Sequence, residues 1–456
     1  MKYKMRTNIY ENKGNLFIDD KKVEEKINSR LYNTSKVKIK VIPTIVLDDN
    51  INIGKDKYLI TEVSTDENCK DEDLKKAILD LNTKIEQGNR FDRKSWQLFY
   101  LFKEIITMLK TLGYNYFRGQ QQDWITKPAI FRNYIRKDYV NENKQYYFNE
   151  FERLYKEICH EFPDELKYIE YPKEKGDNTS IQNRANSLSI LQHYGIPTSL
   201  LDITENPFVA LLFMFGTDKP ILNPQFESYQ IYEEHESKSI VSFVDKTAQN
   251  KRIKAQNGAF LNYDKLEDIM QITDDDFQID LEYCPINRVI INVEIEKDYT
   301  IKYLKKVLLD ESNKDLEIKF NIGKFMRDIN IESLSTEDLT FEEELKKLYS
   351  GIGDYNKRFI NDYITILKQS FLYDKNEIEE YKDVMESKSD EIIKKTFINI
   401  KNEMILKLEE YNYLEKKLYP DFVDYLRFKN NEYALQNSDQ VKKYKINKHV
   451  SSDVSK

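Results

Sequence analysis

The chain changes character near residue 300, and this change limits its possible folds more than any other feature. Before that point, short apolar or alternating segments typical of strands are separated by helical periodicity, and eight of the ten prolines lie between residues 94 and 300. After Pro285 no proline occurs until Pro420, and Lys/Glu-rich helical periodicity dominates. This separation predicts an α+β fold, with a mixed-sheet core, an N-terminal β-rich region and an all-helical insertion.

The same pattern gives approximate boundaries. The strand-like segments at 37–47 and 57–63 belong to a β-rich region over residues 1–90, and a mixed core follows over 94–300. A helical lobe is expected over 301–403. The polar segment 436–456 is expected to be a disordered tail.

Composition excludes several classes of function. A net charge of −8 argues against a generally basic nucleic-acid binder, although a local basic groove is compatible with it. Three widely spaced cysteines and four histidines provide no metal-ligand spacing, so no metal site is expected. No apolar run reaches membrane length and the first residues contain no signal-peptide core, so we expect a cytoplasmic protein without a membrane partner.

The segment YNYFRGQ, residues 114–120, combines chemistry suited to an anion or a flat ring. A strand period of two would place Tyr114, Tyr116 and Arg118 on one face. Arginine offers a planar fork for phosphate or carboxylate, and tyrosine stacks on rings. Gly119, one of only 12 glycines, would let backbone or ligand approach closely. The alternative is an edge strand whose arginine pairs with a surface carboxylate.

A second segment, TSLLDITENPFVALLFMF, predicts a buried strand followed by a helix. Asp202 and Thr204 would share one strand face. Asn206 followed by Pro207 is a strong signal for a helix start. Residues 207–215 are apolar on all sides and predict a core helix, with a strand as the alternative. The positive end of that helix could hold an anion, although ordinary capping explains the same residues.

Two further groups of residues are weaker candidates. His193 and Tyr194 lie at the end of a predicted helix, where a histidine is favoured by the helix dipole and is more often structural. Arg252 and Gln256, in the segment RIKAQNGAFL, could clamp a polar ligand. Neither group indicates a chemistry by itself.

Taken together, these segments resemble the FRG-domain family, which is named for its Phe-Arg-Gly motif. The matching motifs are FRGQ at 117–120, LQHYGIPTSLLDITENPFVALLF at 191–213 and R-x-x-x-Q-x-G-x-F at 252–260. KKLYPDFVDYLRF at 416–428 looks like the closing motif of that family, so the core would be completed by residues 404–428. Ile203 and Asn257 depart from the residues common in the family, an aromatic and a glutamine.

The layout of this family is similar to that of ADP-ribosyltransferases, and the likeness implies roles for individual residues. Arg118 would contact a phosphate or ribose of NAD, Gln256 would approach the acceptor, and Tyr194 and Phe208 would wall the nicotinamide. Asp202, Thr204 and the helix capped by Asn206 would line the site. The likeness therefore implies catalytic roles for Arg118, Asp202 and Gln256, and adds to the cofactor-binding set Tyr116, Gly119, Gln120, His193 and Arg252.

Such a reaction also needs a carboxylate to stabilise an oxocarbenium-like ribose. The third motif contains none, and Asp202, Glu205 and Glu294 are the open alternatives.

We therefore expect a bacterial toxin or phage-defence effector that uses NAD as its cofactor or substrate, of the ADP-ribosyltransferase or NAD-glycohydrolase type. The first alternative is a non-catalytic module that senses a nucleotide or a protein, such as a phage-derived trigger. The second is an RNA-binding or RNA-processing protein, for which Arg118, Arg252 and the aromatics would hold a single strand.

Overall fold

The computed structural model describes twelve stretches of the chain. These are residues 28–47, 51–67, 69–92, 97–131, 147–172, 176–216, 221–244, 251–266, 270–272, 277–279, 283–297 and 376–437. The first 27 residues of the predicted β-rich region, most of the predicted helical lobe and the predicted tail from 438 onward lie outside them.

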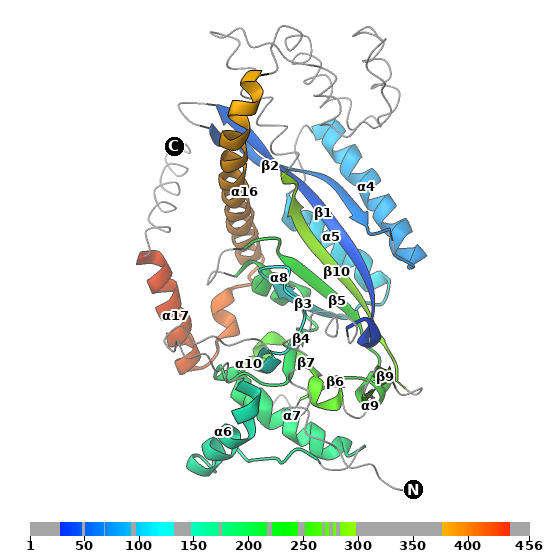
Figure 1. Cartoon of the computed structure of the whole chain (residues 1–456), viewed down its shortest axis with the longest axis vertical. Helices are drawn as coiled ribbons and strands as arrows, with labels where there is room; N and C mark the ends of the chain where they lie inside the picture. The colour runs from blue at the N-terminus through cyan, green and yellow to red at the C-terminus, as the bar shows by residue number, and fades with distance from the viewer. Residues whose placement is uncertain are drawn as a thin grey trace.

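A mixed eight-stranded sheet forms the centre of the molecule (Figure 1), which confirms the predicted α+β class. Its strand order is β2-β1-β10-β5-β3-β4-β7-β6. The pairing of β1 with β10 is parallel, and the other pairings in the sheet are antiparallel. The strands are β1 Tyr32–Leu47, β2 Ile51–Thr65, β3 Tyr116–Gln120, β4 Leu200–Thr204, β5 Gln225–Gln230, β6 Val241–Ser242, β7 Gly258–Asn262 and β10 Ile286–Ile295. The strands β8 Met270–Ile272 and β9 Phe277–Ile279 form a separate pair.

The N-terminal strands belong to the same sheet as the predicted core. Strand β1 pairs with β10 continuously from Tyr32 opposite Ile286 to Val41 opposite Ile295. Strand β2 then covers the outer edge of β1. The β-rich region and the core thus share one set of backbone hydrogen bonds, and β1 builds one wall of the polar face described below.

Helices cover the sheet on two sides and at one end. They are α4 Glu72–Asp92, α5 Leu98–Thr111, α6 Tyr147–Glu161, α7 Asn178–His193, α8 Pro207–Phe215, α9 Glu234–Lys238, α10 Lys251–Gln256, α16 Asn376–Glu410 and α17 Phe422–Asn437, with short 3-10 turns η1 Ala129–Phe131, η2 Tyr263–Lys265 and η3 Glu415–Leu418. In Figure 1, α6 and α7 lie beside β4 and β7, at the end of the molecule away from α4.

Two apolar cores result from this arrangement. In the first, α4, α5, α8 and α16 pack against β1, β2, β10 and β3, for example through Phe102, Leu211 and Phe397. In the second, α6 and α7 pack against β4 and β7, for example through Phe151 and Phe260. The short middle strands β3 and β4 therefore run between two packed layers, and they carry the polar residues singled out in the sequence.

Helix α8 forms as its sequence predicts, and the strand alternative for 207–215 is wrong. The side chain of Asn206 accepts a hydrogen bond from the backbone N–H of Phe208 at 3.0 Å, and Pro207 occupies the first turn. Seven of the nine residues of the helix are buried, because it is enclosed by β3, β4, β5 and α16. An apolar surface on every side of a helix requires such an environment.

The expectation that Tyr114 shares a face with Tyr116 and Arg118 is wrong. Strand β3 begins at Tyr116, so the period of two does not extend back to Tyr114. Tyr114 packs in the first core with Phe117, whereas Tyr116 packs in the second. The aromatic pair predicted for one sheet face is therefore divided between the two cores.

Candidate functional site

Gly119 brings helix α8 into direct contact with strand β3. A Cβ atom at this position would lie 1.8 Å from the carbonyl oxygen of Ala210 and 2.7 Å from the backbone nitrogen of Met214. No side chain fits there without displacing the helix. Glycine thus follows Arg118 because the backbone of α8 lies on the strand, and the space over Gly119 is filled by that helix.

Arg118 points to the other face of β3 and reaches strand β4. Its Nη1 donates a hydrogen bond to the backbone carbonyl oxygen of Asp202 at 2.9 Å. Its Nε is buried and has no hydrogen-bond partner among the described residues. The guanidinium is held in position by the main chain of Asp202 and keeps a donor for a further acceptor.

Glu205 is an exposed carboxylate that two side chains orient. The hydroxyl of Tyr116 donates to Oε1 at 2.9 Å, and Nδ2 of Asn257 donates to Oε2 at 2.5 Å. Burial, and then the bond to Glu205, raises the pKa of Tyr116, so the phenol remains a donor. Asn257 has a φ of 48°, a left-handed conformation that asparagine tolerates better than most residues.

Thr204 on β4 and Gln256 at the end of α10 also connect these two segments, through buried atoms. The hydroxyl of Thr204 donates to the backbone carbonyl oxygen of Gln256 at 2.5 Å and accepts from the backbone N–H of Asn206 at 3.0 Å. The side chain of Gln256 is buried, and its amide nitrogen has no hydrogen-bond partner within the described part of the chain. A second buried donor therefore lies at the end of α10, two residues before β7.

These contacts show that the three sequence segments converge. We refer to Tyr116, Arg118, Asp202, Glu205, Gln256 and Asn257 as the Arg118 cluster.

The carboxylates left open by the sequence occupy different places. The Glu205 carboxylate belongs to the Arg118 cluster, whereas Glu294 lies on β10 and pairs with Lys38 at 3.1 Å. Asp202 contributes its backbone carbonyl to Arg118, and its side chain is half-buried. The geometry therefore favours Glu205 as the carboxylate of this cluster.

His193 and Arg252 attach the closing segment to the core. Nε2 of His193 lies 2.6 Å from the carboxylate of Asp421, and Nη1 of Arg252 donates to the carbonyl of His193 at 3.3 Å. The guanidinium of Arg252 also lies 5.3 Å from the ring centre of Tyr419. Both predicted ligand-binding residues therefore hold residues of the expected closing motif at 416–428.

The remaining candidates have separate neighbours. Phe208 stacks on Tyr413 with ring centres 4.7 Å apart, and Tyr194 packs edge-on against His193. The two rings expected to wall one nicotinamide are thus occupied by different partners. Gln120 donates from Nε2 to the carbonyl oxygen of Trp124 at 2.7 Å and fixes the loop after β3.

A large open pocket lies away from the Arg118 cluster. It has a volume of about 1050 Å³ and is lined by residues of β1 and β10, by the 123–126 loop and by Gln225. None of the residues given a catalytic or cofactor-binding role by the sequence lines it, although Tyr114 and Glu294, one of the open carboxylates, do. Two of its walls, β1 and β10, lie about 250 residues apart in the sequence, so no local pattern indicates the pocket.

The described residues hold no group of three His, Cys, Asp or Glu side chains that could bind a metal ion, and none of the helices described is long and apolar enough to cross a membrane.

A comparison with known families supports the resemblance found in the motifs. Residues 114–221 match the family model of the FRG domain. The match includes the FRGQ motif and the segment 191–213, but not the third motif at 252–260 or the closing motif. No curated protein and no solved structure matches the chain.

Proposed function

We propose that the FRG-domain protein acts on NAD at the Arg118 cluster, as an ADP-ribosyltransferase or an NAD glycohydrolase. The observation that carries the proposal is the exposed Glu205 carboxylate, oriented by Tyr116 and Asn257 and joined through β4 to the carbonyl that holds Arg118. This combination of an anion-binding group and an oriented carboxylate suits cleavage of a charged glycosidic bond.

In the proposed reaction, the bond between the nicotinamide nitrogen and the ribose C1′ breaks, and nicotinamide leaves with the bonding electron pair. The ribose then carries positive charge, which the Glu205 carboxylate stabilises. Water, or a hydroxyl or amine of an acceptor, attacks C1′ and loses a proton. Arg118 holds a phosphate or ribose oxygen of NAD during this step.

Gln256 completes the proposed site. Its buried amide nitrogen lies at the end of α10, next to Asn257, which binds Glu205. There it would donate to the incoming acceptor. We further propose that loss of NAD in the host cell is the biological effect, which fits a toxin or phage-defence effector in a bacterial cytoplasm.

The proposal is tested by incubating the purified protein with NAD and measuring nicotinamide release and mass shifts in proteins of a cell extract. Wild-type protein is expected to release nicotinamide, and the Glu205→Gln variant is expected to lose this activity. Glu161→Gln, at an exposed position on α6, is the matched control. If neither nicotinamide release nor a mass shift occurs, the chain does not act on NAD in this way, and a ligand-dependent melting shift without turnover would favour the sensing alternative.

A further inference from the structure

Glu227 on β5 is fully buried, and its partners Thr126, Gln225 and Arg288 line the open pocket. One carboxylate oxygen accepts from the hydroxyl of Thr126 at 2.7 Å and from Nε2 of Gln225 at 2.9 Å, and the other accepts from the hydroxyl of Tyr229 at 2.5 Å. Nη1 of Arg288 lies 3.7 Å from the second oxygen, within ion-pair range but beyond a hydrogen bond. The carboxylate is therefore satisfied by neutral donors.

Arg288 lines the pocket, and one nitrogen of its guanidinium makes no hydrogen bond to the described residues. Nε and Nη2 both donate to the hydroxyl of Thr34, at 3.2 and 3.0 Å, and the guanidinium lies 4.1 Å from the ring centre of Tyr32. The side chain is 7% exposed, and Nη1 has no hydrogen-bond partner in the part of the chain that the structure describes. A buried charged donor without an acceptor destabilises the fold unless a ligand or water accepts its hydrogen bond.

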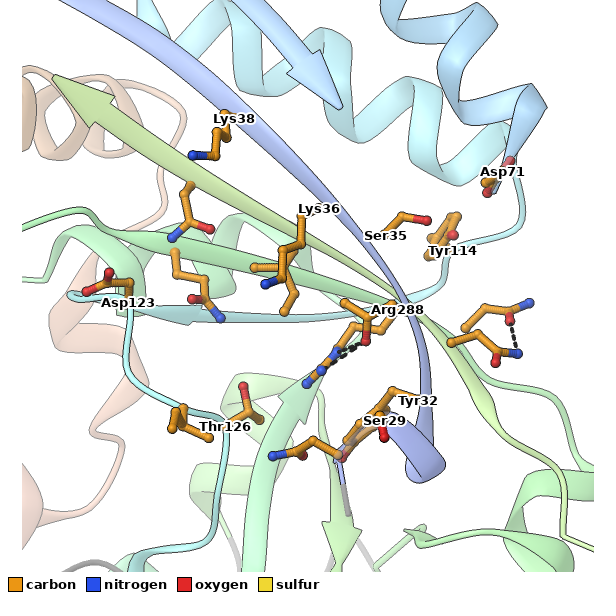
Figure 2. Close-up of a pocket in the computed structure, with 18 of the residues that line it drawn as sticks. Ser29, Tyr32, Ser35, Lys36, Lys38, Asp71, Tyr114, Asp123, Thr126 and Arg288 are labelled. Carbon is orange, nitrogen blue, oxygen red and sulfur yellow. Dashed lines mark hydrogen bonds between the residues drawn. The ribbon is translucent and has the colours of Figure 1, made fainter. Parts of the chain in front are cut away.

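Figure 2 shows the Arg288 guanidinium on the same side of β1 as Lys36 and Thr126. Asp71 and Tyr114, which also line the pocket, lie on the other side of β1 in this view. The Arg288 side of the pocket is therefore separated by the strand from the Asp71 carboxylate.

Two cationic donors on the Arg288 side can hold an anion. Glu294 pairs with Lys38 at 3.1 Å, and the charge of the buried Glu227 is offset by Arg288 at 3.7 Å. Lys36 and Asp123 are the other charged residues of the lining on this side. Phosphate is favoured here by the buried guanidinium and the flexible ammonium group of Lys36, not by a net positive charge.

Trp124 adds a flat apolar surface at the rim. Its side chain is 45% exposed, and its carbonyl is held by Gln120. An exposed tryptophan on an anchored loop suits stacking of a planar ring beside the phosphate site.

We propose that the Arg288 side of the pocket is a second ligand site, which binds a nucleoside monophosphate with its phosphate on Arg288 and Lys36 and its base on Trp124. It is separate from the site proposed for NAD, whose residues do not line it. The ligand would contact the loop that directly follows the FRG strand, so it is placed to influence the Arg118 cluster through β3.

The test is titration calorimetry of the full chain with AMP, adenosine and inorganic phosphate. Wild-type protein is expected to bind AMP more tightly than phosphate. Lys36→Glu and Arg288→Gln should each weaken binding of AMP about tenfold or more, as expected for loss of a charge-assisted hydrogen bond. Trp124→Ala should weaken the binding of AMP but leave the binding of phosphate unchanged.

Lys394→Glu, the same charge change at an exposed position on α16, should bind AMP as the wild type does. If Arg288→Gln fails to fold by circular dichroism, Lys36→Glu decides, because Lys36 is exposed. Absence of AMP and phosphate binding, or unchanged binding in Lys36→Glu, overturns the proposal. Equal binding of AMP and phosphate overturns the nucleoside part. Glu205→Gln should bind AMP as the wild type does, because Glu205 does not line the pocket. The AMP titration therefore tests the second site, and the NAD assay tests the Arg118 cluster separately.

Discussion

Arg184 on α7 and Arg288 on β10 are both buried, yet their hydrogen-bond partners differ. On α7, Arg184 is 0% exposed; its Nε donates to Asp264 at 3.0 Å, its Nη1 donates to the carbonyl of Ile169 at 2.8 Å, and its Nη2 pairs with Glu152. Arg288 directs two nitrogens to a single threonine hydroxyl, and its third, Nη1, lies 3.7 Å from Glu227 and has no hydrogen-bond partner among the described residues.

The difference separates a structural arginine from one suited to binding. In the Arg184 network every nitrogen of the guanidinium has an acceptor within the protein, and the rings of Tyr155 and Tyr171 lie on it at 5.5 and 5.6 Å. Nothing remains for a ligand. Arg288 is also buried but has an incomplete set of acceptors, and a buried donor without a hydrogen bond is a candidate for ligand binding.

The largest expected loss of stability follows from replacing Arg184. Arg184→Met leaves the carboxylates of Asp264 and Glu152 without their partner, and breaking a buried pair from one side costs about 4 kcal/mol. Urea denaturation followed by circular dichroism measures the change. The control is Arg153→Met, which removes an exposed pair to Glu157 on α6 and should change stability by less than about 0.5 kcal/mol. A loss of stability no larger than that of the control would contradict the structural role.

Gly119→Ala should destabilise the fold by about 3 kcal/mol, because the new methyl group overlaps the backbone of α8. Thermal denaturation compares it with Gly258→Ala, where the nearest atoms to a new Cβ lie at 3.7 Å and little change is expected. This pair tests whether the FRG glycine serves helix packing. Equal melting temperatures for the two variants would show that α8 does not lie on β3 in solution.

Arg288→Gln should cost about 2 kcal/mol, less than Arg184→Met, because Glu227 keeps three neutral donors. Chemical denaturation of the two variants side by side measures this order directly. In addition, a fixed concentration of AMP should raise the melting temperature of the wild type more than that of Arg288→Gln. If Arg288→Gln proves as destabilising as Arg184→Met, the two networks are equivalent, and the distinction between them is lost.

Glu205→Gln should leave stability unchanged within about 0.5 kcal/mol, because the side chain is exposed and the amide oxygen can accept from Tyr116 or Asn257. Its melting curve, recorded beside that of Glu161→Gln, checks this. A large loss of stability would make Glu205 a structural carboxylate like Glu152.

Local signals predicted part of this architecture. Asn206 and Pro207 specify the start of α8 through capping, and the apolar sequence of that helix requires a buried position. The three motifs that resemble the FRG family also come together, where β3, β4 and the segment before β7 meet. Such features depend on neighbouring residues or on a recognisable pattern, so a single sequence reveals them.

Features that depend on strand register were not predictable. Strand β5, which carries Glu227, was not among the predicted strands, and the parallel pairing of β1 with β10 joins residues about 250 positions apart in sequence. Gly119 is needed because α8 crosses β3 at that residue, and not because a ligand approaches there. A crossing of two elements cannot be seen in the sequence around the glycine. The burial of Arg288, with Nη1 lacking a hydrogen bond among the described residues, also depends on the register of β1 with β10.

The most direct test of the account is the release of nicotinamide from NAD by wild-type protein and by Glu205→Gln, measured at equal concentration after both are shown to be folded. The account predicts steady release by the wild type and at least a hundredfold slower release by the variant, as expected for loss of a group that stabilises the transition state. Equal release by the two proteins would contradict the role of Glu205, and no release by either would contradict the action on NAD.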